Sequence, residues 1–101
     1  GIYGLTYKED VDDVRESPTL QMLESMESHL CGHAVRVYDP WVERNIVPNQ
    51  VHSMEEFLEG LEVVIVMVGH SQIKGKPELF GNRVLIDPRN VCGDGENVYK
   101  L

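Results

Sequence analysis

The sequence has no long hydrophobic run. Its longest apolar stretch is VVIVMVG, Val63 to Gly69, which falls well short of the roughly 18 residues that a membrane-spanning helix needs. The chain also does not open with a basic segment followed by an apolar one, the pattern of a secretory leader. These two absences predict a protein with no membrane association and a cytoplasmic location.

Positive charge is scarce. Lys and Arg number 9 against 17 Asp and Glu, so the formal net charge is −8. Nonspecific nucleic-acid binding depends on a basic surface that neutralises phosphates, and the composition therefore argues against a nucleic-acid partner. An anionic ligand would have to be held by a few cations placed close together, against the field of the whole domain.

Cysteine is scarce as well. Only Cys31 and Cys92 are present, and their spacing fits no metal site. Cys31 falls at the end of a predicted helix, where a thiolate is not favoured, and no histidine or asparagine can be assigned to Cys92 as a partner. We therefore predict two reduced thiols, no catalytic residue and no metal site in this chain.

Apolar β-prone stretches alternate with segments of helical spacing along the 101 residues, which fit a single domain, residues 1–101. Strands are predicted at 1–6, 33–40, 63–68 and 83–88 with a short edge strand within 43–51, and helices at 18–30 and 53–60 with one more helical turn within 76–82. The run 63–68 is apolar on both faces, which is typical of a central strand covered on two sides. The pattern predicts an α/β fold, a Rossmann-like three-layer α/β/α sandwich with a mainly parallel sheet. A strand at the first residue suggests a fragment of a longer protein.

Ligands of such sheets bind beyond the carboxyl ends of the strands. Lys8 follows the first predicted strand, Arg89 follows the last, and Arg15 lies in the loop after the first. Their convergence on one edge predicts a site for an anion such as a phosphate or pyrophosphate, held by charge-assisted hydrogen bonds. The alternative is that Lys8 and Arg15 only pair with acidic neighbours in the same loop.

Two further polar residues, Asp39 and His70, stand at strand ends. An acid at the end of the second strand binds the ribose in many dinucleotide-binding folds. Here, however, the first turn lacks the G-x-G-x-x-G fingerprint. We therefore interpret Asp39 as a structural strand end and His70 as a satisfied polar terminus, and we do not expect a self-sufficient NAD site.

The connection between the first strand and the first helix is unusually long and acidic. It reads GLTYKEDVDDVRESPTL, Gly4 to Leu20, and resembles the opening of the C-terminal, UDP-binding domain of the UDP-glucose/GDP-mannose dehydrogenase family. Three further matches follow in order: VRVYDPWV (Val35 to Val42), LEVVIVMVGHSQIK (Leu61 to Lys74) and VLIDPRNV (Val84 to Val91). The form of the first motif is most like that of members that oxidise UDP-N-acetylhexosamines, such as UDP-N-acetyl-D-mannosamine.

The resemblance implies a function for the longer protein. Members of the family oxidise the C6 hydroxyl of a nucleotide sugar to a carboxylate in NAD-dependent steps, with NAD held mainly by an N-terminal domain. It implies a cytosolic homodimeric parent, with the remainder of its own chain and a UDP-sugar as partners. The family's catalytic cysteine lies outside this domain, so the isolated fragment is predicted to be inactive.

The resemblance also assigns roles to individual residues. Tyr7 and Lys8 match an aromatic-lysine pair that contacts the nucleotide sugar, and Arg89 and Asn90 match a turn that also contacts it. Arg15 matches an arginine that reaches toward the NAD held by the other domain. Acidic residues of the loop, Asp12 and Asp13, are expected to brace Arg15.

Two other functions remain open on the sequence alone. A phosphoacceptor, receiver-like signalling domain would use the acidic pair Asp12 and Asp13, the acid Asp39 and the lysine Lys74. A plain protein-interaction module would use large apolar residues, Trp41 and Phe57. Binding of acetyl phosphate or beryllofluoride would support the signalling function, and binding of UDP would support the nucleotide-sugar function.

Overall fold

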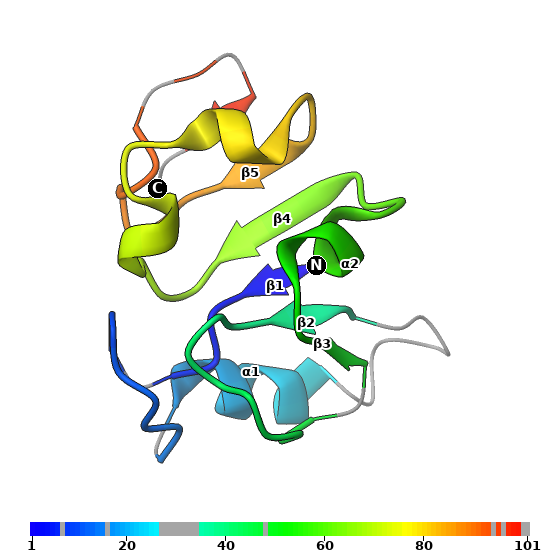
Figure 1. Ribbon diagram of the computed structural model, residues 1–101, viewed down its shortest axis with the longest axis vertical. Helices are drawn as coiled ribbons and strands as arrows, with labels where there is room; N and C mark the ends of the chain where they lie inside the picture. Colours follow the sequence, from blue (N-terminus) through cyan, green and yellow to red (C-terminus); the bar gives the residue numbers. More distant parts are fainter. Residues whose placement is uncertain are drawn as a thin grey trace.

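The computed structural model describes residues 1–6, 8–15, 17–26, 35–47, 49–93, 95 and 97–99. Its sheet consists of β1 (Ile2–Tyr3), β2 (Val37–Tyr38), β3 (Gln50–Val51), β4 (Val63–Val66), β5 (Val84–Ile86) and β6 (Val98–Tyr99). All neighbouring strands are parallel, in the order β3-β2-β1-β4-β5-β6 (Figure 1). This is the order of a doubly wound Rossmann sheet, so the predicted fold class is confirmed. The order reverses between β1 and β4, and the crevice beyond their carboxyl ends is the expected place for a ligand.

Among the described residues, the helical segments between the strands are α1 (Pro18–Met26), α2 (Met54–Leu58), and the 3-10 helices η2 (Ser71–Ile73) and η3 (Pro77–Phe80). Each α-helix begins at a serine cap. Ser17 Oγ accepts from the amide of Leu20 at 3.4 Å, and Ser53 Oγ accepts from the amide of Glu56 at 3.1 Å. The Glu56 carboxylate accepts from the Ser53 hydroxyl at 3.3 Å. In a complete capping box, this carboxylate would instead accept from the backbone amide of Ser53. Gly60, at φ 71, follows the end of α2 as predicted.

One face of the sheet packs against α2, η2 and η3, which lie in front of the sheet in Figure 1. Its buried cluster is Tyr3, Tyr38, Phe57, Val64, Val66, Ile73, Phe80, Leu85 and Cys92. Phe57 is 0% exposed and packs its ring against those of Tyr3 and Tyr38. The expectation that Phe57 could serve an interaction surface is therefore wrong.

Only half of the opposite face of the sheet is covered by a helix of the described residues. Around β1 and β2, Ile2 and Val37 are buried against a cluster that includes Leu20 and Leu23 of α1. Strand register places Val63 on this face too, in the β4–β6 half of the sheet. The described α-helix on this side of the sheet is α1, and it packs over β1 and β2. Among the described residues, no helix covers the β4–β6 half of this face.

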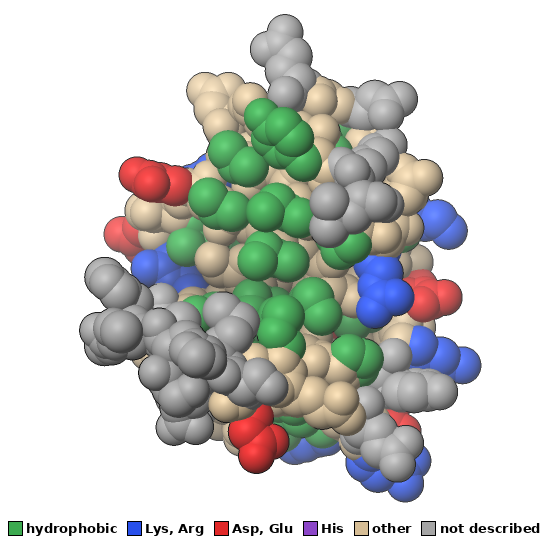
Figure 2. Space-filling model, turned by 180° about the vertical axis from the view of Figure 1, so that it is seen from behind, with side chains coloured by type: hydrophobic (Ala, Val, Ile, Leu, Met, Phe, Trp, Pro, Cys, Tyr) green, Lys and Arg blue, Asp and Glu red, His purple; other side chains and the backbone are tan. Residues whose placement is uncertain are grey.

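The open half of this face is apolar. Val63 is 39% exposed and Tyr99 is 55% exposed, while Ile65 and Ile86 between them are half-buried. Figure 2, drawn from behind, shows apolar side chains gathered on this face. The prediction that the run 63–68 is covered on both sides is therefore wrong for the described residues, because only the side carrying Val64 and Val66 is fully buried.

The predicted elements occur in the predicted places but are shorter. The first strand keeps two residues of the predicted six, β4 ends at Val66, and the edge strand within 43–51 is β3. The helix predicted at 18–30 is confirmed over Pro18–Met26, whereas its end with Cys31, and the start of the strand predicted at 33–40, lie outside the described residues. Within the described part of the chain, no helix has the length and apolar character to span a bilayer.

Candidate functional site

A basic cleft lies at the point where the strand order reverses. It encloses about 590 Å³ beyond the carboxyl ends of β4 and β5, next to the loop that follows β1. Its lining residues are Lys8, Glu9, Pro18, Met67, Val68, Gly69, Lys74, Arg89 and Val91. Three cations therefore share one small cleft in a chain whose net charge is −8. The amino end of α1, at Pro18, adds the positive end of a helix dipole.

Arg89 is held in the cleft by a hydrogen bond to the segment after β4 and by a fixed turn of its own. Its Nε donates to the carbonyl oxygen of Met67 at 2.8 Å, and the described residues give its two Nη groups no partner. The turn itself is fixed by Asp87, whose Oδ2 accepts from the amides of Val91 at 3.0 Å and Cys92 at 2.9 Å. Asn90 occupies the left-handed position of this turn, with φ 57. Arg89 is thus anchored at Nε while its outer nitrogens stay available for a planar oxyanion.

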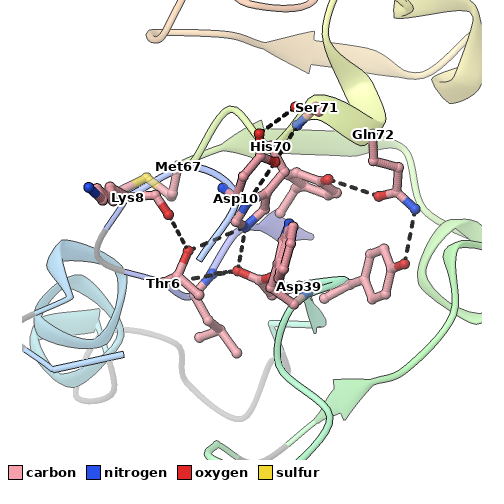
Figure 3. A network of polar contacts seen from close by, with 12 residues as sticks. Thr6, Lys8, Asp10, Asp39, Met67, His70, Ser71 and Gln72 are labelled. Carbon is pink, nitrogen blue, oxygen red and sulfur yellow. Dashed lines mark hydrogen bonds and ion pairs between the residues drawn. The ribbon is translucent and has the colours of Figure 1, made fainter. Parts of the chain in front are cut away.

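The loop that carries Lys8 is fixed by a buried carboxylate. Asp39 Oδ2 accepts from the amides of Leu5 at 2.6 Å and Thr6 at 3.1 Å, and Oδ1 accepts from the amide of Trp41 at 2.8 Å (Figure 3). Burial alone would raise the pKa of Asp39, but the hydrogen bonds from His70 and from these amides outweigh it and hold the pKa below its ordinary value. The structure places Asp39 as a strand-end brace, as predicted.

His70 lies at the centre of the same network and is completely buried. Its Nε2 lies 2.9 Å from Asp39 Oδ2, and its Nδ1 accepts from the amide of Asp10 at 2.8 Å. The prediction of a satisfied polar terminus is therefore confirmed. Asp10, at φ 56, also accepts from the amide of Ser71 at 2.8 Å and from its hydroxyl, and these bonds hold its pKa below the ordinary value.

Arg15 lies in the same loop but outside the cleft. Its Nε donates to Asp13 Oδ1 at 3.0 Å and its Nη2 to Oδ2 at 2.8 Å, a bidentate pair whose arginine side chain is 87% exposed. The expected bracing of Arg15 is thus confirmed for Asp13. Asp12 instead lines a second cleft.

The Arg15–Asp13 pair predicts a measurable acid titration. Hydrogen bonds from the Arg15 side chain and backbone lower the pKa of Asp13 from 3.8 to about 2. Because the native value lies below the unfolded one, the pair is intact above the ordinary pKa and breaks as the pH falls through about 2. We expect a carbon-13 NMR titration of the Asp13 carboxyl to show this, and the variant Arg15→Gln to move the midpoint upward. A midpoint that is the same in both proteins would contradict the pairing.

The second cleft is larger but has the wrong charge for an anion. It encloses about 720 Å³ and is lined by Asp10, Val11, Asp12, Trp41, Glu43 and Arg44. With three carboxylates facing one guanidinium, it would repel a phosphate, so the smaller basic cleft is the better candidate. Trp41, 46% exposed, belongs to this second cleft.

The residues predicted from the sequence are only partly brought together. Lys8 and Arg89 share the basic cleft, whereas Asn90 is exposed in the turn beside it and Arg15 lies apart. Tyr7 lies outside the described residues. Lys74, at the end of η2, completes the cleft but was assigned only to the signalling alternative. Its signal in the sequence is its place in the segment after the central strand, which ends at the same sheet edge as Lys8.

The signalling alternative is not supported. Asp39 is 1% exposed and is saturated by hydrogen bonds from the chain itself, so it presents no acceptor oxygen to a phosphoryl group. Lys74 lines the basic cleft, whereas Asp12 lines the acidic one. Among the described residues no three His, Cys, Asp or Glu side chains are grouped as metal ligands.

Comparisons with known proteins agree with the fold and with the motifs. The model of the UDP-glucose/GDP-mannose dehydrogenase family, UDP binding domain, matches residues 1–100. The UDP-N-acetyl-D-mannosamine dehydrogenase of Methanocaldococcus jannaschii is 29% identical over 99% of this chain and 26% of its own length.

Two solved structures are also similar. The UDP-N-acetyl-mannosamine dehydrogenase Cap5O from Staphylococcus aureus has a TM-score of 0.78 and 32% identity over 98% of this chain and 25% of its own. The UDP-D-ManNAc dehydrogenase from Pyrococcus horikoshii has a TM-score of 0.74 and 28% identity over 98% and 24%. The chain thus spans about a quarter of the length of these relatives.

Proposed function

Because the chain belongs to the UDP-glucose/GDP-mannose dehydrogenase family, as its UDP-binding domain, we propose that its basic cleft binds the diphosphate of a UDP-sugar. The observation that carries this proposal is the convergence of Lys8, Lys74 and Arg89 at the β1/β4 switch point. Each cation can form a charge-assisted hydrogen bond with a phosphate oxygen, worth about 1.5–3 kcal/mol. Arg89 is the best placed of the three, because its bond to Met67 directs the free edge of the guanidinium.

The activity that we propose for the longer protein is that of an NAD-dependent UDP-sugar 6-dehydrogenase in cytoplasmic polysaccharide biosynthesis. It would oxidise the C6 hydroxyl to a carboxylate and act as a homodimer. Relatives named as UDP-N-acetyl-D-mannosamine dehydrogenases favour an N-acetylhexosamine as the sugar. This domain would supply the nucleotide contacts of that enzyme, including those of Tyr7 and Asn90.

NAD itself does not fit these residues as a self-contained site. A dinucleotide site needs a tight glycine turn that sets a helix against the pyrophosphate, whereas here the segment from Gly4 to Ser17 separates β1 from α1. The remainder of the protein would therefore hold NAD. Arg15 is the residue that we propose to reach it, because its bond to Asp13 extends an exposed guanidinium with Nη1 unengaged among the described residues.

Titration of the 101-residue chain with UDP tests the proposal. We expect weak binding, with a dissociation constant near about 1 mM, because half of the proposed site is contributed by other parts of the protein. Amide shifts in an NMR titration should gather on the segments after β1, β4 and β5 and should shrink with added salt. Uridine, which lacks the phosphates, should produce much smaller shifts.

Substitutions in the cleft sharpen this test. Lys8→Ala, Lys74→Ala and Arg89→Ala should each weaken binding of UDP by about tenfold or more, the effect of one lost charge-assisted bond. Lys76→Ala is the matched control, because Lys76 is exposed, lies two residues from Lys74 and does not line the cleft. Equal binding by all four variants, or shifts confined to the second cleft around Trp41, would overturn the proposal.

A further inference from the structure

His70 connects three segments that are far apart in the sequence. From the loop after β4 it reaches Asp39 at the end of β2, and it reaches Thr6 and Asp10 in the loop after β1. The ring is 0% exposed and packs edge-on against Tyr3, with the ring centroids 5.9 Å apart. The imidazole therefore sits where the three segments that border the switch point meet (Figure 3).

The hydrogen bonds determine which ring nitrogen carries the proton. The amide of Asp10 is a donor and lies 2.8 Å from Nδ1, so Nδ1 must be an acceptor without a proton. The proton is then on Nε2, which lies 2.9 Å from the carboxylate oxygen Oδ2 of Asp39 and 3.3 Å from the hydroxyl of Thr6. The arrangement is the neutral Nε2–H tautomer, oriented by a buried carboxylate.

Both sides of the ring are connected to the backbone around Lys8. On the Nε2 side, the Thr6 hydroxyl accepts from the ring and donates to the carbonyl oxygen of Lys8 at 2.8 Å. On the Nδ1 side, the ring accepts from the amide of Asp10, two residues after Lys8. The side chain of Lys8 lines the basic cleft and makes no hydrogen bond or ion pair with the described residues. Its backbone is held, while its side chain is free.

We propose that His70 is a positioning residue for the ligand of the basic cleft: its neutral Nε2–H form fixes the backbone on both sides of Lys8 and so directs the ammonium group toward Lys74 and Arg89. This inference rests on the proposed function. The reversed tautomer would set two donors, Nδ1–H and the Asp10 amide, against each other and leave the Asp39 carboxylate without its ring partner. A residue that merely stabilised the core would have no effect on binding of the ligand once the protein is folded.

Two substitutions separate the two sides of the ring. In His70→Asn the side-chain carbonyl can take the place of Nδ1 and accept from the Asp10 amide, but it cannot reach Asp39. In His70→Gln the longer side chain can donate to Asp39 from the place of Nε2, but the Asp10 amide loses its acceptor. We expect each variant that folds to bind UDP between about two- and tenfold more weakly than the wild type, the effect of one lost hydrogen bond. His52→Asn and His52→Gln are matched controls, because His52 is exposed and bonds only Asn45 among the described residues.

Thr6→Val keeps the inference testable if a His70 variant does not fold. Valine is close in shape to threonine and removes only the hydroxyl that connects the ring to Lys8. It should weaken binding of UDP by a similar factor and shift the Lys8 amide signal, while the ring of His70 keeps its bonds to Asp39 and Asp10.

Nitrogen-15 NMR of the wild-type imidazole supplies an independent reading. We expect the proton on Nε2 and a nonprotonated Nδ1. A reversed tautomer, or unchanged UDP affinity in folded His70 and Thr6 variants, would overturn the inference while leaving the proposed function intact. Failure of the wild-type chain to bind UDP would overturn both.

Discussion

Gly4→Ala should lower the free energy of unfolding by about 3 kcal/mol or more, because it combines backbone strain with overpacking. Gly4 has φ 104, a conformation that residues with a Cβ rarely adopt, and an added Cβ would lie 2.7 Å from both the backbone nitrogen and the Cβ of Val68. Neither β1 nor the segment after β4 can move away without losing the parallel pairing between them. Urea unfolding of both proteins, followed by circular dichroism, measures the difference.

Gly75→Ala is the matched control for the strain term. Gly75 also has a positive φ, 68, but an added Cβ would meet nothing within 4 Å. This variant should therefore lose only about 1–2 kcal/mol, the cost of the left-handed conformation. If the two variants lost the same free energy, the close approach of Gly4 and Val68 would not be a constraint. Because Val68 lines the basic cleft, the larger loss in Gly4→Ala should come with weaker binding of UDP.

The positions of strands and helices could be predicted because they depend on local patterns. The Ser17-Pro18 and Ser53 starts are confirmed, as is the apolar run that becomes β4. Strand lengths could not be predicted, because a strand ends where its neighbour stops pairing, and that is decided by the register with a distant segment. The exposure of Val63 could not be predicted for a similar reason. The pattern of residues shows that both faces of a strand are apolar, but it does not show whether another segment covers each face.

The basic cleft could be predicted in outline, because parallel strands bring their carboxyl ends to one edge. This rule placed Lys8 and Arg89 together. The rule also grouped Arg15 with these two residues, although Arg15 lies outside the cleft. A long loop can place a side chain far from the sheet edge at which the loop begins. The rule gave no partners for His70, whose bonds to Asp39, Thr6 and Asp10 depend on three segments meeting in space. The roles of Tyr7, Lys8, Arg15, Arg89 and Asn90 in binding stay predictions.

Asp39 is the residue at which the fold and the site are most closely joined. Its carboxylate receives the amides of Leu5 and Thr6, at the start of the loop that leads to Lys8, and the ring of His70. Asp39→Ala removes the acceptor from all of these buried donors at once. We expect a loss of about 3–5 kcal/mol in the free energy of unfolding, because several buried donors lose their acceptor together and each unsatisfied donor costs about 1–3 kcal/mol. Thermal and urea unfolding of the purified chain would measure it.

Asp39→Asn and a pH series distinguish the charge of this carboxylate from its shape. The amide oxygen of Asn can still accept from some of these donors, so we expect a smaller loss of stability than for Asp39→Ala. Asp12→Ala is the control: Asp12 is an exposed acid, and its loss should change the free energy of unfolding by at most about 0.5 kcal/mol. Hydrogen bonds outweigh burial and lower the pKa of Asp39 in the native state, so its charge stabilises the fold above the unfolded pKa and loses that effect as the pH falls through the native value. The gap between wild type and Asp39→Asn should therefore be widest near neutral pH and narrow in acid. A gap that stayed constant down to acid unfolding would mean that the carboxylate acts through its shape alone, and that the negative charge beside His70 does not fix the ring.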